Sequence, residues 1–147
     1  MRACTAIHFA LVIAVATLLH ADEPASRPTR SAPLSAKTTE EVIKFVEPQK
    51  GFGCIQTAQF NRWGRQVFAI WYCPFSGRGD CFLDVYYYDY DKTQWTCFLD
   101  RLVPAGGDLS AEMPNGNEIV FRNTDGKVAV TQSVVTFPQK KWWNDAK

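Results

Sequence analysis

The chain has 147 residues, with 16 Lys or Arg, 15 Asp or Glu and 2 His, and carries a formal net charge of +1 at neutral pH. This near balance of charge gives no electrostatic basis for binding nucleic acid, so we expect no nucleic-acid partner. The length suits one domain with its own core.

Residues 1–21 have the pattern of a secretory signal peptide. Arg2 supplies the positive start, residues 6–19 form a nearly unbroken apolar run, and small Ala21 precedes two acidic residues. The run is shorter than the ~20 apolar residues that span a bilayer. We therefore expect a secreted or periplasmic protein with no membrane span after cleavage; the alternative is an uncleaved anchor helix.

Cleavage after Ala21 would remove both histidines, His8 and His20, from the mature chain. It would also leave 15 basic residues against 15 acidic ones, because Arg2 is the only charged residue in the removed segment. Ser-His-Asp and Cys-His nucleophilic sites need an imidazole, as do the common catalytic zinc sites. We therefore expect none of these sites, no metal and no cofactor.

Beyond the signal peptide the chain contains four cysteines, Cys54, Cys73, Cys81 and Cys97. An even number in an exported chain predicts two disulfides, and four cysteines allow three connectivities. Their spacing lacks the short CxxC interval that is typical of structural zinc sites.

The composition of residues 22–37, rich in Pro, Ser and Ala, predicts a flexible linker. Residues 38–147 would then form a single disulfide-stabilised β domain. Thr38 and Glu41 fit a helix capping box. Apolar residues recur at helical spacing before Pro48, which predicts one short N-terminal helix that uses Val42, Phe45 and Val46.

Six further segments have strand character, since they are rich in β-branched and aromatic residues and are separated by turn-forming residues. The expected strands are 54–60, 66–73, 81–90, 95–103, 118–123 and 127–137. Short strands with tight connections predict a mainly β fold, an antiparallel meander that forms a small sandwich or barrel.

The segments on either side of residues 73–81 predict a hairpin. If Cys73 lies opposite Cys81, one face pairs only apolar or aromatic residues, as a core-facing stripe should. Those pairs are Val67 with Tyr87, Ala69 with Val85 and Trp71 with Leu83; the other face pairs Phe68 with Tyr86, Ile70 with Asp84 and Tyr72 with Phe82. A Cys73–Cys81 disulfide fits this register, and Cys54 would then pair with Cys97 by elimination.

The loop between these two cysteines contains an Arg-Gly-Asp triplet at residues 78–80. Arg78 and Asp80 would project into solvent, as the charged groups of a receptor ligand do. Because ordinary turns are built from the same residue types, we interpret the loop as a hairpin connection and keep Arg78 and Asp80 as candidate binding residues.

The segment Y-D-Y-D-K-T-Q-W, residues 88–95, resembles the hairpin of kelch-type propeller blades, in which a Tyr-Asp turn precedes a Trp. The resemblance covers these residues alone and occurs once, whereas a propeller needs several blades of about 50 residues. It implies shared turn chemistry: Asp89 would accept hydrogen bonds from the turn amides, and Trp95 would pack across the hairpin.

The predicted strand 81–90 carries aromatic residues on both faces. One interpretation is a central strand covered by a second sheet on one side and by the helix on the other. The other is that Tyr86, Tyr88 and Tyr90 form an exposed platform for a glycan, peptide or protein. We favour burial and retain the three tyrosines as candidate binding residues.

For function, we expect a non-catalytic binding module whose aromatic surface contacts an unknown protein or glycan. One alternative is a carboxylate-dependent glycan hydrolase, with Asp84 and Asp100 on neighbouring strands as the acid/base pair. A second alternative is a secreted inhibitor that inserts the 73–81 loop, with Arg78, into an enzyme.

Overall fold

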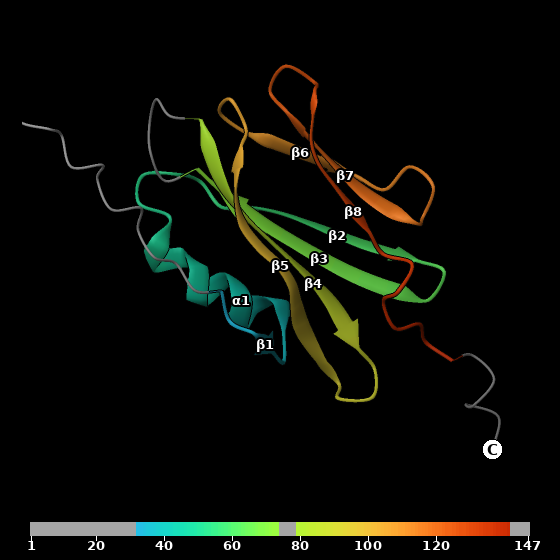
Figure 1. The fold of residues 1–147 in the computed structure, drawn as a ribbon. Coiled ribbons are helices and arrows are strands. Elements are labelled where there is room, and N and C mark those ends of the chain that lie inside the picture. Colours follow the sequence, from blue (N-terminus) through green and yellow to red (C-terminus); the bar gives the residue numbers. More distant parts are fainter. Residues whose placement is uncertain (1–31, 74–78, 142–147) are drawn as a thin grey trace, which may run out of the picture.

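The computed structural model describes residues 32–73 and 79–141 (Figure 1). The predicted signal peptide, most of the predicted linker and Arg78 therefore lie outside the described residues. Within them the chain forms two antiparallel sheets and one short helix, which confirms the prediction of a mainly β fold. The two sheets share a core, as in a sandwich, and do not close into a barrel.

The larger sheet has the strand order β1-β5-β4-β3-β2, and the smaller has the order β6-β7-β8. Figure 1 shows helix α1 on one side of the larger sheet and the smaller sheet on the other. The strands are β1 (Ser35–Ala36), β2 (Gln56–Arg62), β3 (Arg65–Tyr72), β4 (Asp80–Asp89), β5 (Gln94–Pro104), β6 (Leu109–Glu112), β7 (Glu118–Asn123) and β8 (Val128–Ser133).

Helix α1 (Thr39–Val46) begins where the capping pattern predicts and continues into a short 3-10 turn, η1 (Glu47–Gln49). The Thr38 hydroxyl accepts a hydrogen bond from the Glu41 backbone N–H at 3.3 Å, which satisfies one of the first amides of the helix. Val42 and Val46 are buried against the larger sheet, whereas Phe45 lies off that face and is partly exposed.

The hairpin of β3 and β4 has the predicted register, with Val67 opposite Tyr87 and Tyr72 opposite Phe82. One face packs against the smaller sheet in a core that includes Trp71 and Phe121, whose rings meet edge to face at 6.2 Å. The other face packs against α1. The interpretation of β4 as a central strand covered on both sides is therefore confirmed.

The β4–β5 hairpin has the turn chemistry that the kelch resemblance implies. Asp89 Oδ1 accepts hydrogen bonds from the backbone amides of Asp91 and Lys92, both at 3.1 Å. Trp95 is buried and meets the Tyr88 ring edge to face at 5.3 Å. The acidic side chain therefore closes the turn, and the indole packs across the hairpin.

Two strands were missed by the sequence analysis. β1 lies inside the predicted linker: Ser35 pairs with Thr96, and the Cys97 N–H donates to the Leu34 carbonyl at 2.9 Å. Residues 35–36 of the predicted linker therefore belong to the sheet, which they join through backbone groups that the composition does not indicate. β6 pairs with β7 through a segment without β-branched residues.

Candidate functional site

The tyrosines of β4 do not form an exposed platform. Tyr86 is fully buried on the face that packs against α1, so this candidate binding residue is a core residue instead. Tyr88 and Tyr90 are half-buried and meet edge to face at 5.1 Å. The Tyr90 hydroxyl donates to the Gly64 carbonyl at 2.8 Å. Burial, and secondarily Tyr88, raises the pKa of Tyr90, which keeps this phenol a donor.

The two carboxylates of the hydrolase hypothesis, Asp84 and Asp100, are direct partners across β4 and β5. Asp84 is fully buried, whereas Asp100 is exposed and accepts a hydrogen bond from the Ala32 N–H at 3.0 Å. A glycosidase needs both carboxyl groups to reach the same glycosidic bond in a cleft. With Asp84 closed off from solvent, nothing in this arrangement favours glycan hydrolysis.

Of the Arg-Gly-Asp triplet, the structure describes Gly79 and Asp80. Arg78 lies outside the described residues, so the receptor and inhibitor hypotheses for the 73–81 loop remain predictions. Asp80 is the first residue of β4, is half-buried and pairs with Pro104.

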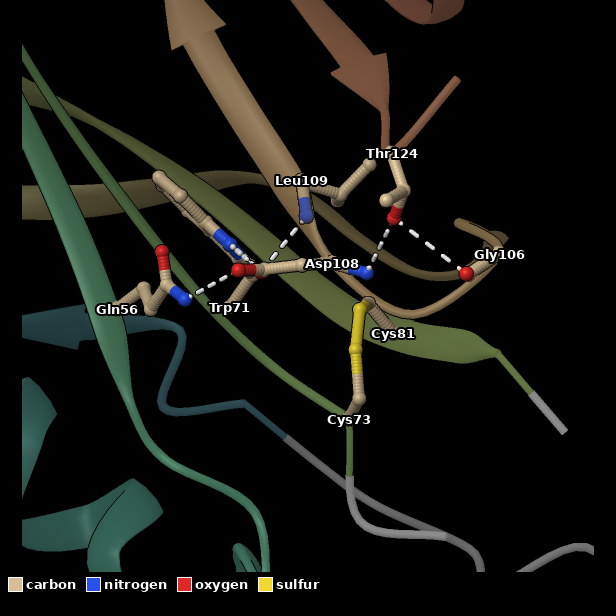
Figure 2. Close-up of a disulfide and its surroundings, with 8 residues drawn as sticks. All are labelled: Gln56, Trp71, Cys73, Cys81, Gly106, Asp108, Leu109 and Thr124. Carbon is tan, nitrogen blue, oxygen red and sulfur yellow. Dashed lines mark hydrogen bonds between the residues drawn. A yellow bond between two sulfur atoms is a disulfide. The ribbon is translucent and has the colours of Figure 1, made fainter. Parts of the chain in front are cut away.

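The predicted Cys73–Cys81 disulfide is present at the base of that loop (Figure 2). Among the described residues, no bridge joins Cys54 to Cys97, contrary to the pairing predicted by elimination. Cys97 lies on β5, and Cys54 lies just before β2, with β4 and β3 between those strands. Three inter-strand spacings amount to about 14 Å, which exceeds the reach of a disulfide.

Asp108 links the two sheets beside this disulfide. Figure 2 shows its carboxylate accepting hydrogen bonds from the Trp71 indole N–H, the Gln56 amide and the Leu109 backbone N–H. The Trp71 bond is 3.2 Å long and satisfies the polar atom of a buried side chain. These bonds have a structural role, because each carboxylate oxygen is directed at a group of the protein itself.

Among the described residues, a groove of about 550 Å³ lies between the β2–β3 hairpin and the chain after β8. We call it the Trp63 groove. Its lining consists of Trp63, Arg65, Val135, Phe137, Gln139, Lys140 and Lys141.

Trp63 is held at the tip of the β2–β3 hairpin in an unfavourable backbone conformation. Its φ is 53° and that of Gly64 is 70°, which makes the pair the centre of a type I′ turn. Asn or Gly is the usual residue where Trp63 stands, and a bulky side chain in this conformation costs about 1–2 kcal/mol. Even so, 69% of the Trp63 side chain is exposed.

A contact with the smaller sheet orients the indole. A Cβ atom at Gly116, between β6 and β7, would lie 2.5 Å from Trp63 Nε1. Gly116 also has a φ of +74°, so both its backbone conformation and the nearby indole require glycine there. One edge of Trp63 is therefore supported by backbone, while most of the ring is left open.

The other side of the groove is fixed by the chain that follows β8. The Lys140 N–H donates to the Gly64 carbonyl at 2.8 Å, which joins this chain to the hairpin tip. Phe137 is buried, and its ring contacts Tyr87 at 5.1 Å and Phe98 at 4.8 Å between ring centroids. The groove therefore has walls that are part of the fold.

Among the described residues, the charged side chains that line the groove are all basic. Arg65 Nη2 donates to the Val135 carbonyl at 3.0 Å, which holds its guanidinium in the groove. Lys140 and Lys141 also line it, and no carboxylate occurs among these lining residues. The arrangement can bind an anionic group beside an aromatic or apolar one.

The described part of the chain has no cluster of three or more His, Cys, Asp or Glu residues suited to a metal ion. Over the same residues, no helix is both long enough and apolar enough to cross a membrane. Comparison with protein-family models, with curated proteins and with solved structures gave no match. Function must therefore be inferred from the chemistry of the site.

The Trp63 groove was not predicted, because residues 61–64 fall between two expected strands and the aromatic surface was expected on the strands themselves. One signal was available: Trp63 occupies the position before Gly64 at which a two-residue hairpin turn favours Asn. The contribution of residues 135–141 had no such signal, since it depends on how the chain folds back after β8.

Proposed function

We propose that this protein is a non-catalytic binding module, and that the Trp63 groove binds an acidic segment of a partner protein. The observation that carries the proposal is the exposed indole of Trp63, which the fold holds in an unfavourable turn conformation. Gly116 contacts one edge of this indole, and Arg65 and two lysines line the groove beside it. A Trp without a binding role would be replaced at this turn by Asn at little cost.

The energetic argument rests on the exposed area of Trp63. A buried Trp side chain covers up to roughly 250 Å², so the exposed 69% is roughly 170 Å². At ~25 cal/mol per Å², complete coverage by a partner would contribute at most about 4 kcal/mol. That is the size expected of an interface hot spot, and Trp and Arg are the residue types enriched at such sites.

The composition of the groove favours a protein segment over a glycan. Val135 is 53% exposed beside the Trp63 ring, and an aliphatic side chain offers a sugar no hydrogen bond. An apolar side chain of a peptide could cover Val135 and Trp63 together, with acidic neighbours facing Arg65 and Lys141.

Two-dimensional ¹H–¹⁵N NMR on the full chain tests this proposal with a capped peptide that alternates glutamate and phenylalanine. We expect the Trp63 indole N–H resonance to shift on titration, and to shift less as salt is added. The same peptide with glutamine in place of glutamate should bind more weakly. Larger shifts with an acidic oligosaccharide than with the acidic peptide would contradict a protein partner.

A matched pair of variants assigns the surface. Trp63→Ala should abolish the binding, whereas Phe52→Ala should leave it unchanged, because Phe52 is fully exposed and does not line the groove. Equal loss in both variants would show that the peptide binds exposed aromatic rings without selecting the groove.

A further inference from the structure

The strand register places three cysteines at one end of the larger sheet. The β2–β3 pairing is antiparallel and ends with Gln56 opposite Trp71. Continuing the same register by two residues brings Cys54 next to Cys73, which is itself bonded to Cys81 on the far side. The backbone supports this continuation, because a Cβ atom at Gly53 would lie 2.5 Å from the Cys73 carbonyl oxygen.

The side chains of Cys54 and Cys73 belong to the same face of the sheet. Ile55 packs with Tyr72 in the cluster beneath α1, whereas Gln56 reaches Asp108 on the opposite side. Because side chains alternate along an extended chain, Cys54 points to the side of Gln56. Cys73 packs on that side too, since it joins the core between the two sheets.

The strand order sets the direction from which Cys54 approaches the disulfide. β3 lies between β2 and β4, so the Cys73 sulfur has Cys81 on one side and the chain that leads into β2 on the other. Figure 2 shows Gln56 of β2 and Cys81 of β4 on the two sides of the strand that ends at Cys73. A thiolate attacks one sulfur of a disulfide and displaces the other. The strand order places Cys54 on the side of Cys73 away from Cys81, which is the side from which such an attack would come.

We propose that Cys54 is the attacking thiol of an internal thiol–disulfide exchange site. The Cys54 thiolate bonds to Cys73 Sγ, the Cys73–Cys81 bond breaks, and Cys81 leaves as a thiolate that takes up the proton lost by Cys54. The number of disulfides is unchanged, so the step needs no oxidant or reductant.

The surroundings of Cys54 suit this role. Cys54 is exposed and accessible, whereas Cys81 is fully buried. Lys50 lies close by: its pKa is raised, chiefly by the hydrogen bond and charge of Glu47 and to a smaller extent by Cys54. The isomer with the buried Cys73–Cys81 bond is therefore the major form, and the Cys54–Cys73 isomer is the minor one.

Disulfide mapping by mass spectrometry on the chain of 147 residues tests the proposal. After incubation at pH 8.5 and an acid quench, the wild type should yield a minor Cys54–Cys73 linked peptide together with alkylated Cys81. Its amount should fall after incubation at pH 6, where fewer thiols are ionised. Cys54→Ser, a change at an exposed position, should remove both products, and Cys97→Ser should keep them.

A second variant tests the geometry directly. In Cys81→Ser, oxidised glutathione should convert Cys54 and Cys73 to an intramolecular disulfide, despite any loss of stability from the buried substitution. Absence of a Cys54–Cys73 link in both the wild type and Cys81→Ser would overturn the proposal. So would a Cys73–Cys97 link in the variant, because Cys97 would then be the nearer thiol.

Discussion

Replacement of Trp63 by Asn tests whether the indole serves binding or the stability of the fold. The substitution relieves a bulky residue at φ 53° and creates the favoured Asn-Gly turn, which should stabilise the protein by about 1–2 kcal/mol. It also removes the shielded third of the side chain. That third is roughly 80 Å², and its burial is worth about 2 kcal/mol at ~25 cal/mol per Å².

The two contributions nearly cancel, so we expect the free energy of unfolding to change by less than about 1 kcal/mol. Urea denaturation followed by far-ultraviolet circular dichroism measures it without relying on the altered fluorescence. Trp95→Asn is the matched control: Trp95 is buried, and its loss should cost about 3–5 kcal/mol. A comparable loss in Trp63→Asn would refute the reasoning, since Trp63 would then be a structural residue.

Three other predictions concern groups whose roles the structure defines. Asp89→Ala removes both hydrogen bonds that close the β4–β5 turn and should lower stability by about 1–2 kcal/mol, measured as a fall of several degrees in Tm. Asp108→Ala leaves the buried Trp71 indole N–H without its acceptor and should cost about 1–3 kcal/mol in urea denaturation; Asp125→Ala, at an exposed turn, should cost little. Because the pKa of Tyr90 is raised in the folded state, its contribution to stability is present below the ordinary value of about 10 and is lost as pH rises beyond it. Tyr90→Phe should make the free energy of unfolding less dependent on pH above about 10, and an unchanged slope would contradict this assignment.

The β3–β4 hairpin could be predicted because several independent features of the sequence agree on one register. Alternation placed Val67, Ala69 and Trp71 on one face, and Cys73 and Cys81 closed the same register. A shift of the β3–β4 register by one residue would expose that whole apolar face, so few other registers were possible. The Asp89 turn was predictable for a similar reason, since an Asp side chain and turn amides interact locally.

The missed features depend on contacts between distant parts of the chain. β1 joins β5 through backbone atoms, and its two residues carry no strand pattern of their own. The pairing of Cys54 with Cys97 was inferred by elimination, which assumes that every cysteine forms a bridge. For Tyr86 the sequence left burial and exposure both open, with burial favoured, and only the packing of α1 against β4 decides between them.

The most direct test of the Trp63 groove as a binding site is isothermal titration calorimetry with the acidic glutamate–phenylalanine peptide, on the wild type and on Trp63→Asn. We predict that the wild type binds and that the variant binds at least about 30-fold more weakly, the equivalent of a 2 kcal/mol hot spot. Its stability, measured in parallel, should be unchanged. Equal affinities in the two proteins would contradict the proposed function, because the exposed indole would then contribute nothing to binding.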